Sequence, residues 1–194
     1  MVIGLTGQSG AGKTTVSDTF SKNGFAVINC DMVSRKVNEA GSECNHRLAV
    51  FFPDCFDKAF SLDRRKLGEI VFSDKEKLKL LNSIVYPFIV KMIDDEIEKL
   101  SRKYKYIILD APTLFEAGAD KICDKIVSVI ADKQLRFTRI KERDRIEDYL
   151  IEKRFMSQHT SEFFISNSDY VIENNGDIDN AVSQTMSVIK RIKG

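Results

Sequence analysis

A short stretch near the start of the chain constrains the fold most. Residues 7–15 read GQSGAGKTT and fit the spacing G-x-x-x-x-G-K-[ST]. Glycines in such a loop let backbone N–H groups turn toward a phosphate. A helix that begins directly after the loop adds the positive end of its dipole. The match lies between an apolar run at 2–7 and a helical pattern at 13–22, so a strand, a phosphate-binding loop and a helix are predicted in that order.

All residues of this loop are candidate ligands for a nucleoside triphosphate. Lys13 is expected to neutralise charge on the β- and γ-phosphates, and the hydroxyl of Thr14 to bind Mg²⁺. Switch GTPases, ATPases and small-molecule kinases share such a loop, so the motif alone leaves the function open. A guanine-specifying N-K-x-D stretch is absent, which disfavours a GTPase. The candidate ligands are Gly7, Gln8, Ser9, Gly10, Ala11, Gly12, Lys13, Thr14 and Thr15.

The rest of the chain alternates apolar runs with helical patterns. Further apolar runs lie at 25–30, 104–112, 125–132 and 168–176, and helical patterns at 31–40, 135–144 and 178–192. Strands that are apolar throughout, separated by helices, indicate a parallel sheet covered on both faces. We therefore predict an α/β fold with a five-stranded parallel sheet. Asp31 is a candidate N-cap and Gly41 a candidate stop for the helix at 31–40.

A long interruption separates the second and third predicted strands. Residues 42–104 carry apolar side chains at three-to-four spacing, which predicts a helical subdomain inserted into the core. Pro87 cannot continue an undisturbed helix, so this pattern predicts two helices that meet near Tyr86.

The composition restricts the possible partners. The net charge is +1, with 43% apolar and 30% charged residues, which is typical of a soluble globular protein and argues against a general nucleic-acid or membrane-surface binder. The four cysteines form no C-x-x-C pair, and no apolar stretch is long enough to span a membrane. We expect a cytoplasmic protein.

Two aspartates and two pairs of arginines are candidates for the chemistry. Asp31 and Asp110 lie at the predicted carboxyl ends of buried strands, where α/β folds bind ligands. A carboxylate there can accept a proton from an acceptor hydroxyl or hold the water shell of a metal. Arg139 and Arg143 share a helix face and can stabilise a transferring phosphoryl group. A solvated charged face is the alternative for this pair and for the pair Arg64 and Arg65.

In combination and in this order, these segments resemble the dephospho-CoA kinase family over nearly the whole chain. The segments that carry the likeness are TGQSGAGKTTV, CDMVSRKV, LDRRKLGEIVFSD, LDAPTLFEAG, RIKERD, RFMSQ and DYVIENNG. The sequence departs from the family pattern at Asn29, where an acidic residue is common, at Tyr86-Pro87, where His-Pro is common, and at Thr113, where leucine is common.

The resemblance assigns roles to individual residues. It implies that Asp31 is the catalytic carboxylate, that Arg35 lies near the acceptor, and that Arg64 and Arg65 form a basic pair in the substrate subdomain. Asp110 ends the run YIILD, which resembles a Walker-B arrangement, and is expected to support the metal or water at the substrate. Further along the chain the resemblance implies that Arg139 and Arg143 face the phosphates from a lid, that Arg154 and Gln158 lie in its later part, and that Asn175 and Gly176 lie near the adenine. His46 and His159 show no metal-ligand spacing and are expected to be incidental.

The implied reaction is phosphorylation of the ribose 3′-hydroxyl of dephospho-CoA by ATP with Mg²⁺, giving coenzyme A and ADP. The implied parts of this single domain are a core (about 1–41, 105–138 and 168–194), a substrate insertion (about 42–104) and a lid (about 139–167). A nucleoside or nucleoside-monophosphate kinase is the alternative enzyme, and a nucleotide-dependent switch is the alternative from another class. The sequence predicts neither the oligomeric state nor a preference for ATP over GTP.

Overall fold

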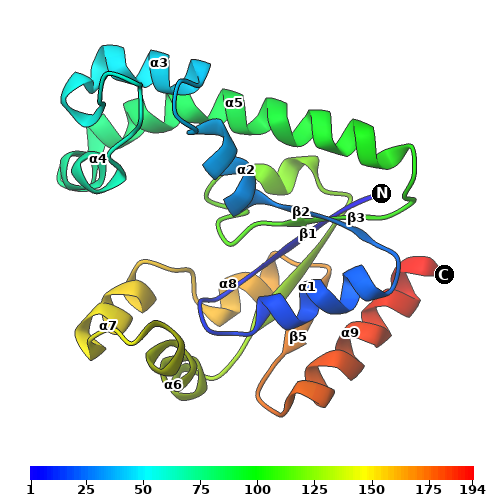
Figure 1. Cartoon of the computed structure of the whole chain (residues 1–194). Coiled ribbons are helices and arrows are strands. Elements are labelled where there is room, and N and C mark those ends of the chain that lie inside the picture. Colours follow the sequence, from blue (N-terminus) through cyan, green and yellow to red (C-terminus); the bar gives the residue numbers. More distant parts are fainter. The chain divides into compact units, whose positions relative to one another are not determined.

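The computed structural model describes residues 1–194 and divides into two compact units (Figure 1). The first unit comprises residues 1–28 and 100–194, and the second comprises residues 29–99. The boundaries predicted for core, insertion and lid remain a prediction. No helix is both long and apolar enough to cross a membrane.

A five-stranded parallel sheet forms the centre of the first unit. Its strand order is β2-β3-β1-β4-β5, which confirms the predicted fold class. The phosphate-binding loop follows the central strand. The strands are β1 (Val2–Gly7), β2 (Ala26–Asn29), β3 (Ile107–Asp110), β4 (Lys125–Ile130) and β5 (Tyr170–Glu173).

Both faces of the central strand β1 are buried, which explains its unbroken apolar sequence. Ile3 and Leu5 are fully buried in the main core, whereas Gly4 lies against Leu114 and Cys123. The core includes side chains from α1 and α9, which pack on each other. The helices of the first unit are α1 (Lys13–Lys22), α6 (Lys133–Asp144), α7 (Asp148–Met156), α8 (Ser161–Ser166) and α9 (Ile178–Lys193), with a short 3-10 turn η2 (Ala119–Ile122).

The second unit is helical, as predicted for most of it. Its elements are α2 (Cys30–Val37), α3 (Glu43–Phe51), a 3-10 turn η1 (Pro53–Cys55), α4 (Arg64–Val71) and α5 (Lys75–Ser101), the last of which ends in the first unit.

The expected break at Pro87 is wrong, because α5 runs through it as one helix of 27 residues. Proline removes one backbone hydrogen bond from a helix interior. Val85 and Ile93 are buried on either side of Pro87, so the packed face of the helix continues past the proline. Burial of a large aliphatic side chain contributes about 1.5–3 kcal/mol, which offsets the local loss.

The expected ends of α2 are also wrong. Its N-cap is Asn29, whose side-chain oxygen accepts a hydrogen bond from the backbone N–H of Met32 at 3.0 Å. Asp31 lies in the first helical turn, where its carboxylate interacts favourably with the helix dipole. Asp31 does not cap the helix. The helix ends at Val37 and not at Gly41, because the Asn38 side chain donates back to the carbonyl of Ser34 and closes the last turn.

Candidate active site

The phosphate-binding loop is held at both ends by the sheet and by α1. The N–H of Gln8 donates to the carbonyl of Val129 at 3.1 Å. A Cβ at Gly7 would overlap the same carbonyl oxygen, so only glycine lets the loop leave β1 so close to β4. At the other end Gly12 adopts φ 93° and ψ 29° and precedes the first residue of α1. The loop therefore has one shape, set by the strand before it and the helix after it.

The first turn of α1 suits an anion. No side chain caps this turn, and it contains no acidic residue, so its backbone N–H groups and the positive end of the helix dipole point to a ligand at the loop. Thr14 lies in this turn with an exposed side chain. This is the position that the sequence predicts for the hydroxyl that binds a metal.

Lys13 and Asp110 form an ion pair beside the loop. The exposed fraction is 19% for the lysine side chain and 7% for the aspartate side chain. Asp110 ends β3 and is paired in register with Leu5 of β1, so the sheet itself carries the carboxylate to the lysine. A partly buried ammonium group is thus balanced by a carboxylate and remains next to the place where phosphates would lie.

Helix α6 and the segment after β5 pack against the loop. A Cβ at Gly10 would lie 2.7 Å from the carbonyl oxygen of Arg136, so this part of α6 packs directly on the loop. The buried side chain of Asn174 donates from Nδ2 to the carbonyl of Ala11 at 2.8 Å. Arg139 donates from Nη1 to the carbonyl of Asn174 at 3.0 Å. Asn174 therefore connects a predicted catalytic arginine to the loop.

A second segment contacts the beginning of the loop. The N–H of Ser9 donates to Oε1 of Gln158 at 3.1 Å, and Nε2 of Gln8 donates to the carbonyl of His159 at 3.4 Å. The hydroxyl of Ser161 donates to Oε1 of Gln8 at 3.3 Å. The turn after α7 and the first residue of α8 are thereby attached to the loop by three hydrogen bonds.

The remaining predicted residues of the first unit lie at the ends of their elements. Arg143 is in the last turn of α6 and bonds to Asp144, which also bonds to Arg154 of α7. Asn175 accepts from the N–H of Asp132 at 2.7 Å and donates to its carboxylate at 3.1 Å, and this joins the β5 end to the start of α6. Gly176 directly follows this contact.

The predicted acceptor-binding residues lie in the second unit, which is described by itself. Asp31 and Arg35 are exposed and one turn apart on α2. Arg64 and Arg65 begin α4 after the N-cap Asp63. The side chain of Arg65 is 90% exposed and pairs with Glu69 at 3.2 Å. Their roles, like those of the residues in the first unit, remain predictions.

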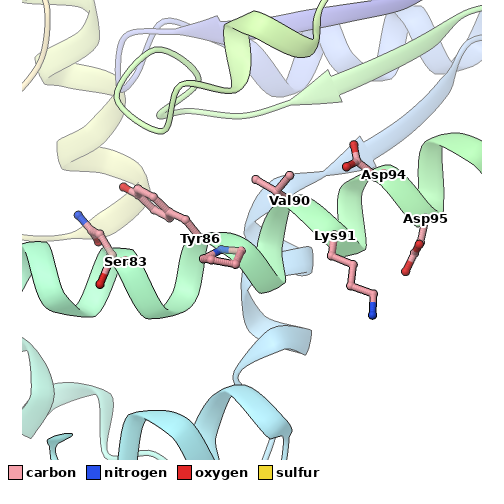
Figure 2. A pocket seen from close by; sticks show the side chains of 8 residues that line it. Ser83, Tyr86, Val90, Lys91, Asp94 and Asp95 are labelled. Carbon is pink, nitrogen blue, oxygen red and sulfur yellow. The ribbon is translucent and has the colours of Figure 1, made fainter.

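A hollow lies along α5 in the second unit. Tyr86, Val90 and Asp94 follow one another at four-residue spacing, and Lys91 and Asp95 project elsewhere from the same helix (Figure 2). The two aspartates make one end of this surface acidic, and Lys91 offsets part of their charge. Tyr86 is one of the positions at which the sequence departs from the family pattern.

Three contributors to the site were not predicted as ligands. Asn174 directly precedes the predicted Asn175, and Arg136 lies about one helical turn before the predicted Arg139. Only their tertiary contacts show that they support the loop. The ring of His159, expected to be incidental, stacks on Phe163 with centroids 3.7 Å apart, and its Nε2 lies 3.6 Å from Oε1 of Glu116. The GKT spacing reveals the loop, but no local pattern reveals which distant side chains support it.

The family is decided by comparison with known proteins. The model of the family described as dephospho-CoA kinase matches residues 1–180. The chain belongs to the dephospho-CoA kinase family. It is 42% identical over 179 residues to the dephospho-CoA kinase of Fusobacterium nucleatum subsp. nucleatum, a match that covers 92% of each chain.

Solved structures agree with membership of the dephospho-CoA kinase family. TT1252 from Thermus thermophilus superposes with a TM-score of 0.89 at 26% identity, over 99% of this chain and 97% of that one. The dephospho-CoA kinase from Campylobacter jejuni superposes with a TM-score of 0.75 at 26% identity, over 98% and 96% of the two chains. The protein is therefore a kinase with a P-loop kinase fold, as the sequence predicts.

Proposed function

We propose that this kinase transfers the γ-phosphoryl group of ATP to the ribose 3′-hydroxyl of dephospho-CoA, giving coenzyme A and ADP. The observation that carries the proposal is the match of the family model over residues 1–180, together with a phosphate-binding loop built between β1 and α1. The loop provides the donor side of the reaction for any kinase of this fold, and the family supplies the acceptor.

In this proposal the loop and Lys13 hold the donor. Backbone N–H groups of the loop and of the first turn of α1 bind the phosphates, and Lys13 exchanges part of its contact with Asp110 for the β- and γ-phosphates. Arg139 and Arg143 donate to the transferring group as its charge spreads over the equatorial oxygens. These contacts cost little reorganisation, because the loop is already held by Val129 and Asn174.

The residues at the loop fit Mg²⁺ as a cofactor. Mg²⁺ is usually held by few protein oxygens together with substrate phosphates and water. The exposed hydroxyl of Thr14 in the first turn of α1, with the carboxylate of Asp110 nearby at Lys13, provides this kind of donor set. When bound, the metal neutralises charge on the β- and γ-phosphates.

Asp31 acts as the proton acceptor in this proposal. The 3′-oxygen of the ribose forms a bond to the γ-phosphorus while the bond from phosphorus to the β,γ-bridging oxygen breaks. The hydroxyl proton passes to the carboxylate of Asp31, and ADP leaves. Three arginines attract the phosphates of the acceptor: Arg35, one turn away on α2, and Arg64 and Arg65 on α4. We place the reaction in the cytoplasm, where protein thiols are kept reduced.

The test is mass spectrometry of dephospho-CoA after incubation with the protein, ATP and Mg²⁺. We expect the acceptor to gain one phosphate, and absence of this product would refute the proposal. Asp31→Asn should retain ATP binding and lose most of the transfer, whereas Asp18→Asn, on the exposed side of α1, should retain both. Lys13→Ala should impair nucleotide use with any acceptor, whereas Lys22→Ala at the exposed end of the same helix should not.

A further inference from the structure

We propose that Asp144 is a positioning residue that holds Arg143 and Arg154 together, so that a phosphate meets a preformed pair of guanidinium groups. The inference rests on the proposed phosphoryl transfer and adds a residue to its machinery. Arg143 donates to Asp144 from Nε at 2.7 Å and from Nη2 at 3.1 Å. Arg154 donates from Nη1 to Oδ2 of the same carboxylate at 2.7 Å. One carboxylate thus binds two arginines from two different helices.

The chain direction at the end of α6 brings these groups together. Helix α6 ends at Asp144, and the next residue, Arg145, adopts the left-handed conformation with φ 51° and ψ 40°. The N–H of Arg145 bonds to the carbonyl of Lys141 at 3.0 Å and closes the helix. A non-glycine residue rarely adopts this conformation. The reversal returns the chain as α7, which carries Arg154, so the carboxylate at the end of one helix faces the arginine of the other.

Other contacts already join α6 to α7 without these arginines. Lys133 pairs with Glu152 at 2.8 Å and Lys141 pairs with Asp148 at 2.8 Å. The guanidinium of Arg136 lies 4.5 Å from the ring centroid of Phe155. The two peripheral ion pairs are exposed and contribute little to stability. Because the helix pair has this redundant set of contacts, the distinct effect of Asp144 is on the position of the two arginines.

The electrostatics of the triad support this role. Hydrogen bonds, the larger effect from Arg143 and the smaller from Arg154, hold the pKa of Asp144 far below its usual range. The carboxylate is therefore charged at any pH at which the enzyme works. The three groups together carry one net positive charge and still attract phosphate. A guanidinium has five N–H donors, and Arg143 uses two on Asp144 while Arg154 uses one. Both arginines therefore retain donors for a ligand.

The orientation of α6 directs this pair to the nucleotide side. Arg139 and Arg143 are four residues apart and share a helix face. Arg139 bonds to the carbonyl of Asn174, whose side chain bonds to Ala11 of the loop. The same face of α6 thus meets the loop at one point and presents the arginine pair one turn further along. Without Asp144 the guanidinium groups of Arg143 and Arg154 would repel each other, and each incoming phosphate would have to bring them together.

The experiment compares Asp144→Asn with Asp148→Asn, since both remove one negative charge from the same helix pair. We expect Asp144→Asn to lower kcat/KM for ATP about tenfold, as for loss of preorganised donors, and Asp148→Asn to leave it within about twofold. Inorganic phosphate should inhibit Asp144→Asn only at a higher concentration than the wild type, because the two arginines no longer form a preorganised pair for an anion. Asp148→Asn should resemble the wild type in this assay.

Two further variants separate positioning from folding. In an Arg154→Gln background, Asp144→Asn should lower kcat/KM much less, because only one arginine is left to position. Asp144→Glu keeps the charge and should be inhibited by phosphate at about the wild-type concentration, also if Asp144→Asn does not fold. Equal effects of Asp144→Asn and Asp148→Asn, or an unchanged effect in the Arg154→Gln background, would each overturn the proposal. So would a folded Asp144→Glu that resists phosphate more than the wild type does. A wild type that makes no coenzyme A would instead refute the proposed function.

Discussion

Replacement of Gly12 by alanine tests how the loop is held in shape. Gly12 has φ 93°, and a Cβ at this position would overlap Nδ2 of Asn174. That nitrogen is the donor to the carbonyl of Ala11. Alanine therefore has two separate costs, one for the backbone conformation and one for displacement of a buried amide from its hydrogen bond.

The two costs can be estimated separately. A left-handed conformation costs a residue with a Cβ roughly 1–2 kcal/mol relative to glycine. A buried polar group that loses its partner costs about 1–3 kcal/mol. We therefore expect Gly12→Ala to lower the free energy of unfolding by about 2–5 kcal/mol. In a chain of this size each kcal/mol corresponds to about 2–4 °C in Tm, so a decrease of about 10 °C is expected.

Gly24 provides a matched control. Its φ is 83°, but a Cβ there would meet no atom within 4 Å, so Gly24→Ala has only the backbone cost of about 1–2 kcal/mol. The assay is thermal and urea unfolding of both variants and of Gly12→Ala combined with Asn174→Ala. The double variant should be less destabilised than the sum of the single variants, because the overlap is removed. Equal losses for Gly12→Ala and Gly24→Ala would show that Asn174 does not restrict this position.

Two further predictions concern the thiols and the long helix. Burial raises the pKa of Cys44 to about 11, and burial with the nearby Asp120 and Asp124 raises the pKa of Cys123 to about 12. Both thiols are therefore protonated at pH 8, so iodoacetamide should label them much more slowly in the native protein than after unfolding. Labelling of the native protein should accelerate as the pH rises toward these values. Labelling of native Cys123 at the unfolded rate would contradict this. Pro87→Ala restores a helix N–H within α5 and should stabilise the protein by about 1–3 kcal/mol in urea unfolding, whereas a lower stability would mean that the proline ring makes contacts worth more than that bond.

The sheet and α1 could be predicted because their signals are local. Each strand is an apolar run, and the loop motif states where β1 ends and α1 begins. The failure at Pro87 has the opposite cause. The proline rule counts one lost hydrogen bond, whereas the continuity of α5 depends on buried side chains such as Val85 and Ile93 on both sides of it.

The cap of α2 shows a second limit of local reasoning. Asn29 and Asp31 are both good cap residues and are two positions apart. Only the backbone decides between them, and it is still extended at Asn29, with φ −87° and ψ 109°. Support of the loop by Asn174 and Gln158 is even harder to predict from the sequence. These side chains are about 150 residues or more from their partners, and no spacing rule covers such a contact.

The strand order has a consequence for synthesis of the chain on the ribosome. The loop is translated before its hydrogen-bond partners Val129 and Asn174. At about 5–20 residues per second, roughly 10–30 s separate translation of Lys13 from translation of Asn174. Until β3 and β4 have been made, β1 also lacks both of its neighbours, and its edges are open to other chains. The loop is therefore fully supported for nucleotide binding only after Asn174 has been made.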